Sequence, residues 1–249
     1  LATGNAPSSH ILKPAIPGIE ESVENEEFCM MLAERMGLTV PKARIRQGHD
    51  RLYIVERYDR ERHQGGEILR LHQEDFCQAL ELLPEQKYEA EGGPSLERCF
   101  ALLKEQSASP ASDQKAFLFW VVFNALIGNA DAHAKNLAIL YTPRGPRLAP
   151  FYDLISTLVY PDLSSRLAMR IGGENRLNWI QQRHWEKFSG EVGIKARWTL
   201  TMVRYISQRV SSLTDSVAAE FTETYGRSAT VEKVVQLIKK TASRFAGST

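Results

Sequence analysis

The sequence has few cysteines and no apolar run long enough to cross a bilayer. Its three cysteines, Cys29, Cys77 and Cys99, are far apart and form no CxxC pair. Because their neighbours are apolar, we expect reduced thiols in the core of a cytoplasmic protein. The longest apolar run, residues 116–127, is interrupted by Asn124 and is shorter than the roughly 20 residues of a membrane span. No segment is organised as a signal peptide, and we expect no association with a membrane.

The chain also lacks an excess of charge. It carries 31 Lys and Arg residues against 30 Asp and Glu residues, for a formal net charge of +1. This balance gives no global basic field and so does not argue for nucleic-acid binding. The 249 residues suffice for one large domain or two small lobes with a substantial buried core.

Several phosphate-binding and nucleophile motifs are missing. Gly4 is the only glycine before Lys13, and neither GxGxxG nor GxxxxGK[ST] occurs. No GxSxG elbow is present for a serine nucleophile. The sequence begins at Leu1 rather than Met, in a short turn-like stretch, so we expect a further segment upstream.

Hydrophobic periodicity predicts a mixed front piece followed by a mainly helical one. Residues 1–57 read as strand, helix, strand, strand, and residues 58–72 as a charged connector or exposed hairpin with a Gly-Gly pair at 65–66. Residues 73–249 read as helices with one embedded hairpin near 136–150. We therefore predict an α+β fold of two lobes with a ligand cleft between them. The predicted helices and strands are helices at 20–36, 73–83, 96–106, 112–128, 184–192, 196–212, 216–224 and 231–245, and strands at 9–13, 43–46, 52–56, 136–141, 147–150 and 167–171.

Three polar residues lie at the ends of the apolar elements in the second piece. Asp131 and Asn136 stand five apart on the loop between an apolar helix and an apolar strand, and Asp153 follows the next short strand. Kinases use this order: a catalytic Asp, an Asn five residues later that ligates the metal, and a further Asp that holds the same ions. For Asp131 taken alone, the capping of a turn is the favoured interpretation. Together the three predict a metal-assisted phosphoryl-transfer site.

Other candidates surround this triad. Lys13 ends an early strand and could contact nucleotide phosphates, held by a glutamate of the following helix, for which Glu26 is preferred over Glu27. Lys13 could also be an ordinary solvated strand-end lysine. Residues 56–58 end a strand at the entrance to the connector, where a kinase hinge would pair with adenine, or they form merely a strand end.

Within the loop, His133 could act as a base or ligand, although a structural role bracing the loop is favoured, since no second His or Cys completes a zinc set. Lys135 could lie beside the transferring phosphate or be exposed.

Six ordered segments carry a family resemblance. They are SSHILKP, SVENEEFCMMLAERMGLTVP, IVERYDR, LHQEDFCQALEL with EQKYEAEGGP, LIGNADAHAKNLAIL and LAPFYDLIST, spanning about residues 8–175. Together they resemble the HipA family of bacterial Ser/Thr kinases of toxin–antitoxin systems. Members carry a further N-terminal subdomain and a Gly- and Ser-containing phosphate loop, and neither is visible here. The small lobe of a protein-kinase-like fold is thus expected to be incomplete.

The resemblance implies site roles and partners. Asp131 would be the catalytic base, and Asn136 and Asp153 would hold Mg²⁺. Lys13 would contact the phosphates of ATP, and Glu56, Arg57 and Tyr58 would line the adenine hinge; Glu26, His133 and Lys135 complete the expected nucleotide site.

The family also implies what this protein acts on and binds. The implied substrate is a serine of an aminoacyl-tRNA synthetase, whose phosphorylation stalls translation. The implied partner is a small HipB-like helix-turn-helix antitoxin, through which alone DNA is contacted. Two alternatives remain: a small-molecule phosphotransferase of kinase-like fold, and an inactive kinase-like scaffold that binds an antitoxin.

Overall fold

The computed structural model describes residues 7–48, 51–62 and 67–247. Its strands are β1 (His10–Pro14), β2 (Ala43–Arg46), β3 (Leu52–Glu56), β4 (Arg60–Arg62), β5 (Ile68–Arg70), β6 (Gln73–Asp75), β7 (Ala138–Thr142), β8 (Gly145–Leu148), β9 (Arg166–Ile171) and β10 (Glu174–Arg176). Its helices are α1 (Ser22–Met36), α2 (Phe76–Ala79), α3 (Leu96–Gln106), α4 (Pro110–Ile127), α5 (Gln182–Glu191), α6 (Ala196–Tyr225) and α7 (Ala229–Gly247), with short 3₁₀ helices η1 (Glu89–Glu91), η2 (Ala134–Asn136) and η3 (Leu177–Trp179).

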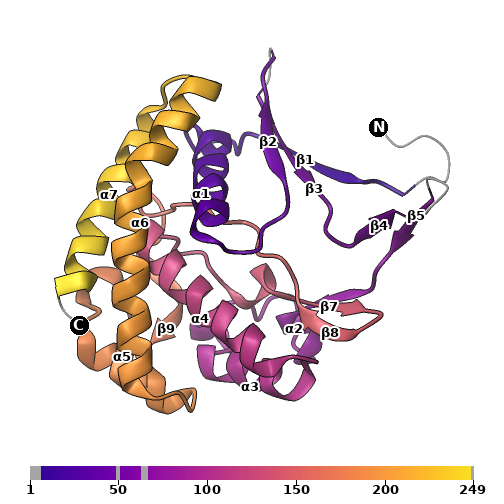
Figure 1. The fold of residues 1–249 in the computed structure, drawn as a ribbon, viewed down its shortest axis with the longest axis vertical. Helices are drawn as coiled ribbons and strands as arrows, with labels where there is room; N and C mark the ends of the chain where they lie inside the picture. The colour runs from indigo at the N-terminus through magenta and orange to yellow at the C-terminus, as the bar shows by residue number, and fades with distance from the viewer. Residues whose placement is uncertain (1–6, 49–50, 63–66, 248–249) are drawn as a thin grey trace.

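The front sheet has the antiparallel order β1-β3-β2, and α1 lies between it and the helices α6 and α7 (Figure 1). Helix α1 ends at Gly37, whose φ of 90° is in the left-handed region that glycine tolerates best. Nearly every residue of α1 is buried, because both of its sides are covered. The predicted front piece of strand, helix, strand, strand is therefore present.

The connector forms a hairpin of β4 and β5, as the charged sequence suggested. The Gly-Gly pair at 65–66 and the turn residues 49–50 lie outside the described residues. Asp59, at the entrance to this hairpin, is buried and accepts hydrogen bonds from the guanidinium groups of Arg57 and Arg60. Burial alone would raise the pKa of Asp59, but the hydrogen bonds and charges of the two arginines outweigh this effect and lower the pKa.

The prediction of one helix over residues 73–83 was wrong. Residues 73–75 instead form β6, which pairs with β7, and only the four-residue α2 follows. Asp75 caps α2 by accepting from the amide of Gln78, so the chain bends there from strand to helix. Strands β6, β7 and β8 make the small sheet that carries the predicted hairpin.

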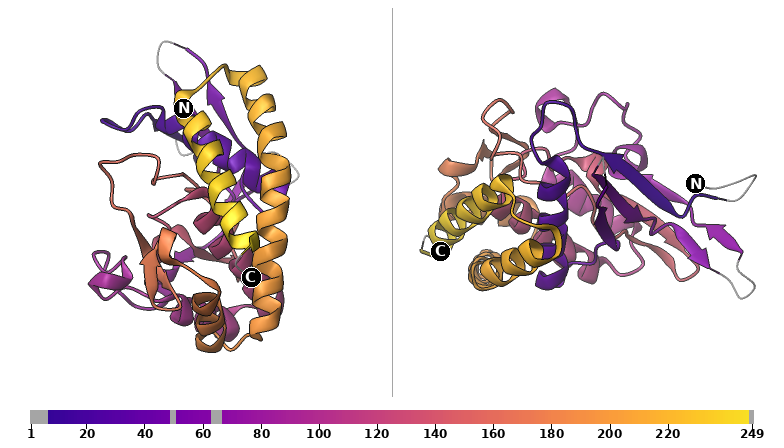
Figure 2. Two further views of the ribbon diagram at one scale, coloured as in Figure 1. Left: turned by 90° about the vertical axis from the view of Figure 1, so that its left-hand side faces the viewer. Right: turned by 90° about the horizontal axis from the view of Figure 1, so that it is seen from above.

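The C-terminal region is built on α6 and α7, which run side by side along one side of the molecule (Figure 2). The predicted break near residues 213–215 is absent, and α6 is continuous over Ala196–Tyr225. No Gly or Pro lies there, and the Thr214 hydroxyl donates to the Val210 carbonyl 2.6 Å away, so the buried polar group is satisfied inside the helix.

One large core joins α1, α4, α6 and α7, and residues 120–127 of α4 are all buried in it. The three cysteines are free and buried, which confirms the prediction of core thiols. Among the described residues, no helix has the length and apolarity needed to cross a membrane. The α+β architecture is confirmed, whereas the exact division at residues 57 and 72 stays a prediction.

A buried carboxylate attaches the β7–β8 hairpin to α4. Asp113 accepts from Arg147 Nη2 at 2.8 Å, from the Ser107 hydroxyl at 2.6 Å and from the amide of Leu148 at 2.9 Å. Burial alone would raise the pKa of Asp113, but the hydrogen bonds from these donors outweigh it and lower the pKa. The carboxylate thus holds the strand that leads to residue 153.

We expect Asp113→Ala to lower the free energy of unfolding by about 3 kcal/mol, because the substitution leaves several donors without their acceptor. Urea unfolding of wild type and variant measures this loss. Asp215→Ala is the matched control, since Asp215 forms an exposed ion pair with Lys239, and its loss should stay below about 1 kcal/mol. Equal effects of the two substitutions would contradict the assigned role of Asp113.

Candidate active site

The loop that carries Asp131 begins where α4 ends. Gly128 terminates the helix with a φ of 69°, and a Cβ there would lie 2.8 Å from the Leu237 side chain of α7. Asn129 follows: its Oδ1 accepts from the amide of Asp131 at 3.1 Å, and its Nδ2 donates to the carbonyl of Asp153 at 3.3 Å. One buried amide side chain therefore holds both acidic residues in place.

Asp131 lies at the edge of a pocket with its side chain half exposed. The Tyr88 hydroxyl donates to Asp131 Oδ1 at 2.7 Å, and His133 Nε2 lies 4.0 Å from the same oxygen. Burial lowers the pKa of His133 against the opposing effect of the Asp131 carboxylate, so the imidazole is neutral near pH 7. Asp131 thus has a half-exposed carboxylate beside a tyrosine hydroxyl and an imidazole, with the Lys87 cation also acting on it, and an acceptor can reach it as it must reach a general base.

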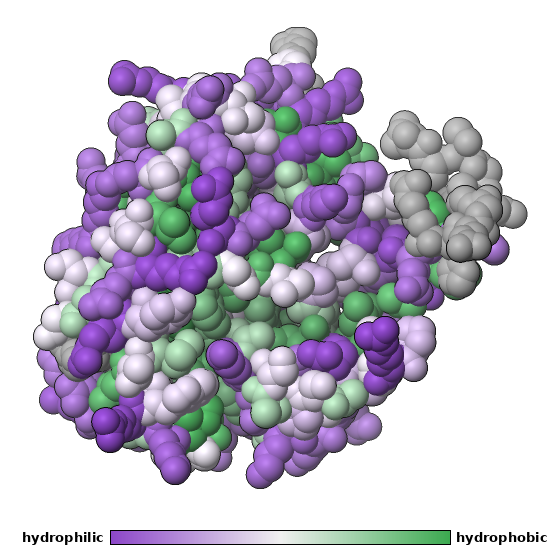
Figure 3. Space-filling model, in the orientation of Figure 1, coloured by the Kyte–Doolittle hydropathy of each residue, from purple (hydrophilic) through white to green (hydrophobic). Residues whose placement is uncertain are grey.

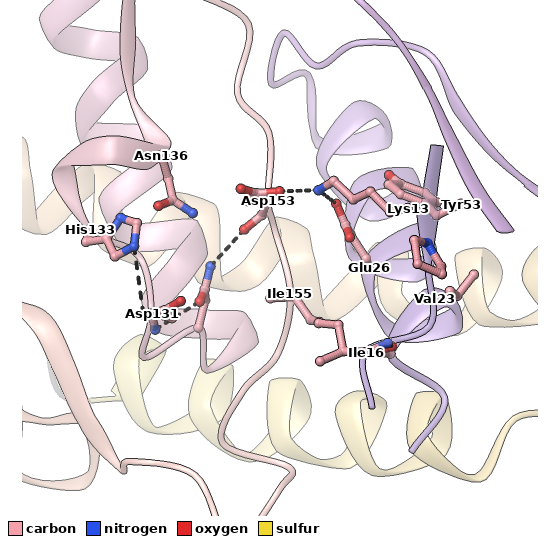
Figure 4. A pocket seen from close by; sticks show the side chains of 13 residues that line it. Lys13, Ile16, Val23, Glu26, Tyr53, Asp131, His133, Asn136, Asp153 and Ile155 are labelled. Carbon is pink, nitrogen blue, oxygen red and sulfur yellow. Dashed lines mark hydrogen bonds and ion pairs between the residues drawn. The ribbon is translucent and has the colours of Figure 1, made fainter. Parts of the chain in front are cut away.

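Asn136 and Asp153 offer oxygen ligands to the same pocket (Figure 4). Asn136 Oδ1 is buried and has no hydrogen-bond partner among the described residues. Asp153 has a φ of 53°, in the left-handed region, where backbone strain is common at functional positions. Amide and carboxylate oxygens suit Mg²⁺, which proteins often hold with one or two side chains while substrate phosphates complete the shell. The donor set therefore fits this ion.

The described residues contain no cluster of three or more His, Cys, Asp or Glu side chains that could bind a metal by themselves.

Lys13 connects the front sheet to this site. Its ammonium group donates to Glu26 Oε1 of α1 at 2.7 Å and also forms an ion pair with Asp153. Figure 4 shows Lys13, Glu26 and Tyr53 on one side of the pocket, His133 and Asn136 on the other, and Asp153 between them. The predicted pairing of Lys13 with Glu26 rather than Glu27 matches this geometry, because Glu27 instead accepts from Tyr225 at 2.8 Å.

These three charges influence one another strongly. Burial opposes the charge of Lys13, but the two carboxylates outweigh it and raise the Lys13 pKa. Burial and the nearby Asp153 carboxylate raise the pKa of Glu26 to about 7, against the opposing effect of Lys13. One ammonium group therefore lies between the carboxylates of Glu26 and Asp153.

A second pocket continues from the same three residues toward the strand end at residues 56–58. Figure 3 shows the surface hollowed between the front sheet and the helical region, with apolar residues gathered inside. The rings of Tyr58 and Tyr152 stack there with centroids 5.9 Å apart. The amides of Glu56 and Arg57 already donate to Lys42 and Ser9 carbonyls, so a base bound here would use other groups.

Lys135 is the predicted residue that the structure does not bring to either pocket. It lies in η2, its carbonyl accepts from the Tyr152 hydroxyl at 2.8 Å, and its charge acts on Cys77 of α2. Its nucleotide-binding role stays a prediction. The remaining predicted residues all line one of the two pockets.

Sequence reasoning missed three residues that shape this site: Asn25, Tyr88 and Asn129. Asn25 of α1 binds Ser156 twice, accepting from its amide and donating to its carbonyl, each at 2.9 Å. Asn25 is next to Glu26, and Asn129 is two residues from Asp131, so closeness in the sequence to a predicted site residue was the available signal. Tyr88 gave no local signal, because its partner lies 43 positions away.

The family is decided by a match over nearly the whole sequence. The profile of the HipA-like C-terminal domain matches residues 1–241. The chain belongs to this family.

Two relatives agree with this membership. A Sinorhizobium fredii protein named Y4mE, a candidate kinase, is 47% identical over 212 residues, which cover 85% of this chain and 49% of the relative. The Serine/threonine-protein kinase toxin HipA of Shewanella oneidensis is 33% identical over 222 residues, covering 84% of this chain and 51% of that protein. The chain spans about half the length of the curated relatives it matches.

Solved structures support the same fold. HipA from the Shewanella oneidensis MR-1 complex of HipA, HipB and operator DNA matches with a TM-score of 0.82 and 29% identity, over 96% of this chain and 57% of that chain. The Helicobacter pylori proinflammatory kinase CtkA matches with a TM-score of 0.58 and 12% identity, over 96% of this chain and 88% of that chain. The predicted two-lobed, kinase-like fold is confirmed.

The raised pKa of Glu26 predicts a stability that depends on pH. The folded protein binds a proton at the Glu26 carboxyl more tightly than the unfolded chain does. The stabilisation of the folded state by this protonated carboxyl is therefore fully present below pH 4.5 and is lost as pH rises through about 7. Glu26→Gln should remove this loss. The wild-type free energy of unfolding should therefore fall relative to the variant by up to about 3 kcal/mol across that range, measured by urea unfolding at a series of pH values.

Glu220→Gln is the control for this pH series, because Glu220 forms an exposed ion pair with Arg35. Its difference from wild type should not vary with pH over the same range. A flat difference for Glu26→Gln as well would contradict the shifted pKa.

Proposed function

We propose that this chain is the catalytic part of a HipA-type Ser/Thr protein kinase that depends on ATP and Mg²⁺ and acts as the toxin of a toxin–antitoxin pair. The convergence of Lys13, Asp131, Asn136 and Asp153 on one cleft carries this proposal. These residues come from the front sheet, the loop after α4 and the segment after β8. Family membership and the kinase names of the relatives support the same reaction.

In this proposal Asp131 is the catalytic base. It accepts the proton of the acceptor hydroxyl while that oxygen attacks the γ-phosphorus of ATP, and ADP departs as the leaving group. Half exposure of the side chain lets an acceptor reach it. Asn129 and Tyr88 keep the carboxylate in position, so little reorganisation is needed at the moment of transfer.

Asn136 and Asp153 are the proposed ligands of Mg²⁺. When bound, the ion supplies positive charge that neutralises the phosphate oxygens. Lys13 is the proposed contact to the nucleotide phosphates, and Glu26 holds its ammonium group toward the cleft. Lys13 also forms an ion pair with Asp153, which reduces the repulsion between the two neighbouring carboxylates.

The second pocket is the proposed adenine site. Residues 56–58 line it, and the stacked rings of Tyr58 and Tyr152 supply an apolar wall for a base. His133 braces the loop as a neutral imidazole.

The proposed substrate is a serine of an aminoacyl-tRNA synthetase in the cytoplasm, and the proposed partner is a HipB-like helix-turn-helix antitoxin. The similar Shewanella structure contains HipA, HipB and operator DNA, which supports a partner of this kind. In this proposal DNA is contacted only through the antitoxin.

We expect Asp131→Asn to lower Mg²⁺-dependent transfer from labelled ATP to a bacterial extract by at least about 100-fold, because the amide cannot accept the proton. Asp153→Asn should lower transfer by a similar factor, because the amide is a poorer ligand for a hard cation. Both variants are made in the full-length protein. Labelling that persists undiminished in both would overturn the assignment.

Thermal unfolding with ATP and Mg²⁺ separates the two roles. The Asp131→Asn variant should keep the stabilisation by the nucleotide, whereas the Asp153→Asn variant should lose the part that depends on Mg²⁺. Asp162→Asn, at an exposed position away from both pockets, is the control and should match wild type in both assays.

A further inference from the structure

A third hollow also reaches Asp131, and Lys13 does not line it. Its volume is about 500 Å³, and it lies between the loop that carries Tyr88 and strand β9. Buried Leu167 and Ala168 form its apolar floor, and exposed side chains surround them. The exposed residues on the rim are Ala90, Glu91, Leu163, Ser164 and Arg166. We call this hollow the acceptor groove.

Tyr88 stands where the acceptor groove meets the active-site pocket. Its hydroxyl donates to Asp131 Oδ1 at 2.7 Å, and its ring meets the His133 ring edge to face with centroids 5.4 Å apart. Burial and the bond to the Asp131 carboxylate raise the pKa of Tyr88, so the hydroxyl remains a donor. The bond occupies one carboxylate oxygen and leaves the other, Oδ2, for a second partner.

The loop around Tyr88 is rigidly held. The amides of Glu91 and Gly93 both donate to the Tyr88 carbonyl, at 2.9 and 2.8 Å. A Cβ at Gly93 would lie 2.7 Å from that same oxygen, so only glycine allows the loop to close this tightly. Glu89 fastens the loop to β9 by accepting from the amide of Arg170 at 2.6 Å. Tyr88 is therefore a fixed support for Asp131 rather than a lid.

Strand β9 does not offer its backbone to a bound chain along this side. The amides of residues 166, 168 and 170 donate to the Ser164 hydroxyl, the Ala130 carbonyl and the Glu89 carboxylate. An extended ligand could not add to this edge as another strand. It would have to be recognised by side chains, namely the apolar floor and the opposite charges of Glu91 and Arg166.

We propose that the acceptor groove binds a polypeptide segment bearing the serine or threonine to be phosphorylated, and that Tyr88 is the positioning residue that orients Asp131 toward its hydroxyl. This inference rests on the proposed kinase function. An open groove with an apolar floor and charges of both signs on its rim suits an extended chain better than a small metabolite, which sites usually enclose.

The step balances without a further reactant. The acceptor hydroxyl proton passes to Asp131 Oδ2, the acceptor oxygen forms its bond to the γ-phosphorus, and the bond from that phosphorus to the ADP oxygen breaks with its electron pair. Tyr88 keeps its own proton throughout and acts only through Asp131.

The first test is Tyr88→Phe in the full-length protein, which removes the hydroxyl and keeps the ring against His133. The substrate is a pool of peptides with a fixed serine or threonine between randomised positions. We expect kcat to fall by about 10-fold with unchanged KM for ATP and for the peptides, because only the orientation of Asp131 is lost. Tyr205→Phe, at an exposed tyrosine that accepts from Arg209, is the control.

An unchanged kcat for Tyr88→Phe would overturn the positioning role. A raised kcat/KM would also overturn it, because it would mean that the Tyr88 hydroxyl merely blocks the place of the acceptor. A KM for ATP that rises without a loss of kcat would reassign Tyr88 to the nucleotide and overturn the inference too.

The second test addresses the groove itself with Leu163→Asp, at a rim side chain that is 38% exposed. We expect KM for the peptides to rise at least about 5-fold with kcat and KM for ATP unchanged, because a charge replaces an apolar contact. Leu83→Asp, at a side chain 66% exposed outside the groove, is the matched control and should behave as wild type.

Outcomes with wild-type protein separate this inference from the kinase proposal. If phosphate is transferred to proteins of an extract but to none of the peptides, the proposal that the groove binds extended segments is wrong, while the proposed kinase function remains supported. A wild-type protein that labels neither would overturn both. Equal peptide KM values for Leu163→Asp and wild type would overturn the groove alone.

Discussion

The ion pairs of Lys13 with Glu26 and Asp153 are the interaction on which the site depends. They join a strand of the front sheet, the buried helix α1 and the segment after β8 at one ammonium group. Two carboxylates this close to each other in a partly buried place would repel, and the cation between them makes the arrangement possible. The same charge lies where the two pockets of the cleft meet, since Lys13, Glu26 and Asp153 line both.

Hydrogen bonds between uncharged groups connect α1 to the loop that holds Asp131. Asn25, next to Glu26, binds the backbone of Ser156 on both sides, and Thr157 then accepts from the amide of Ala130 at 2.7 Å. Ala130 directly precedes Asp131. A short series of contacts therefore connects the helix that supports Lys13 with the loop that supports the proposed base. A shift of α1 would displace both Lys13 and Asp131.

Two separate loops hold Asp131 in place. Asn129 fixes its backbone from within the loop, and Tyr88 fixes its carboxylate from a separate loop fastened to β9. This arrangement leaves the acid accessible from the nucleotide side and from the acceptor groove. In physical terms, a base that must meet a large partner is best held by rigid neutral donors, because these orient it without neutralising its charge.

The sequence by itself determined most of the apolar helices and strands and the order Asp131, Asn136, Asp153, because periodicity and short-range spacing are local properties. It misjudged residues 73–75, which become a strand only because β7 lies beside them, and it placed a break in α6 where burial against the core keeps the helix continuous. Only the tertiary structure decided that Lys13 also pairs with Asp153, that Lys135 lines neither pocket, and that Tyr88 reaches Asp131. Each of these contacts joins residues distant in the chain, and no local preference encodes which distant side chain will arrive.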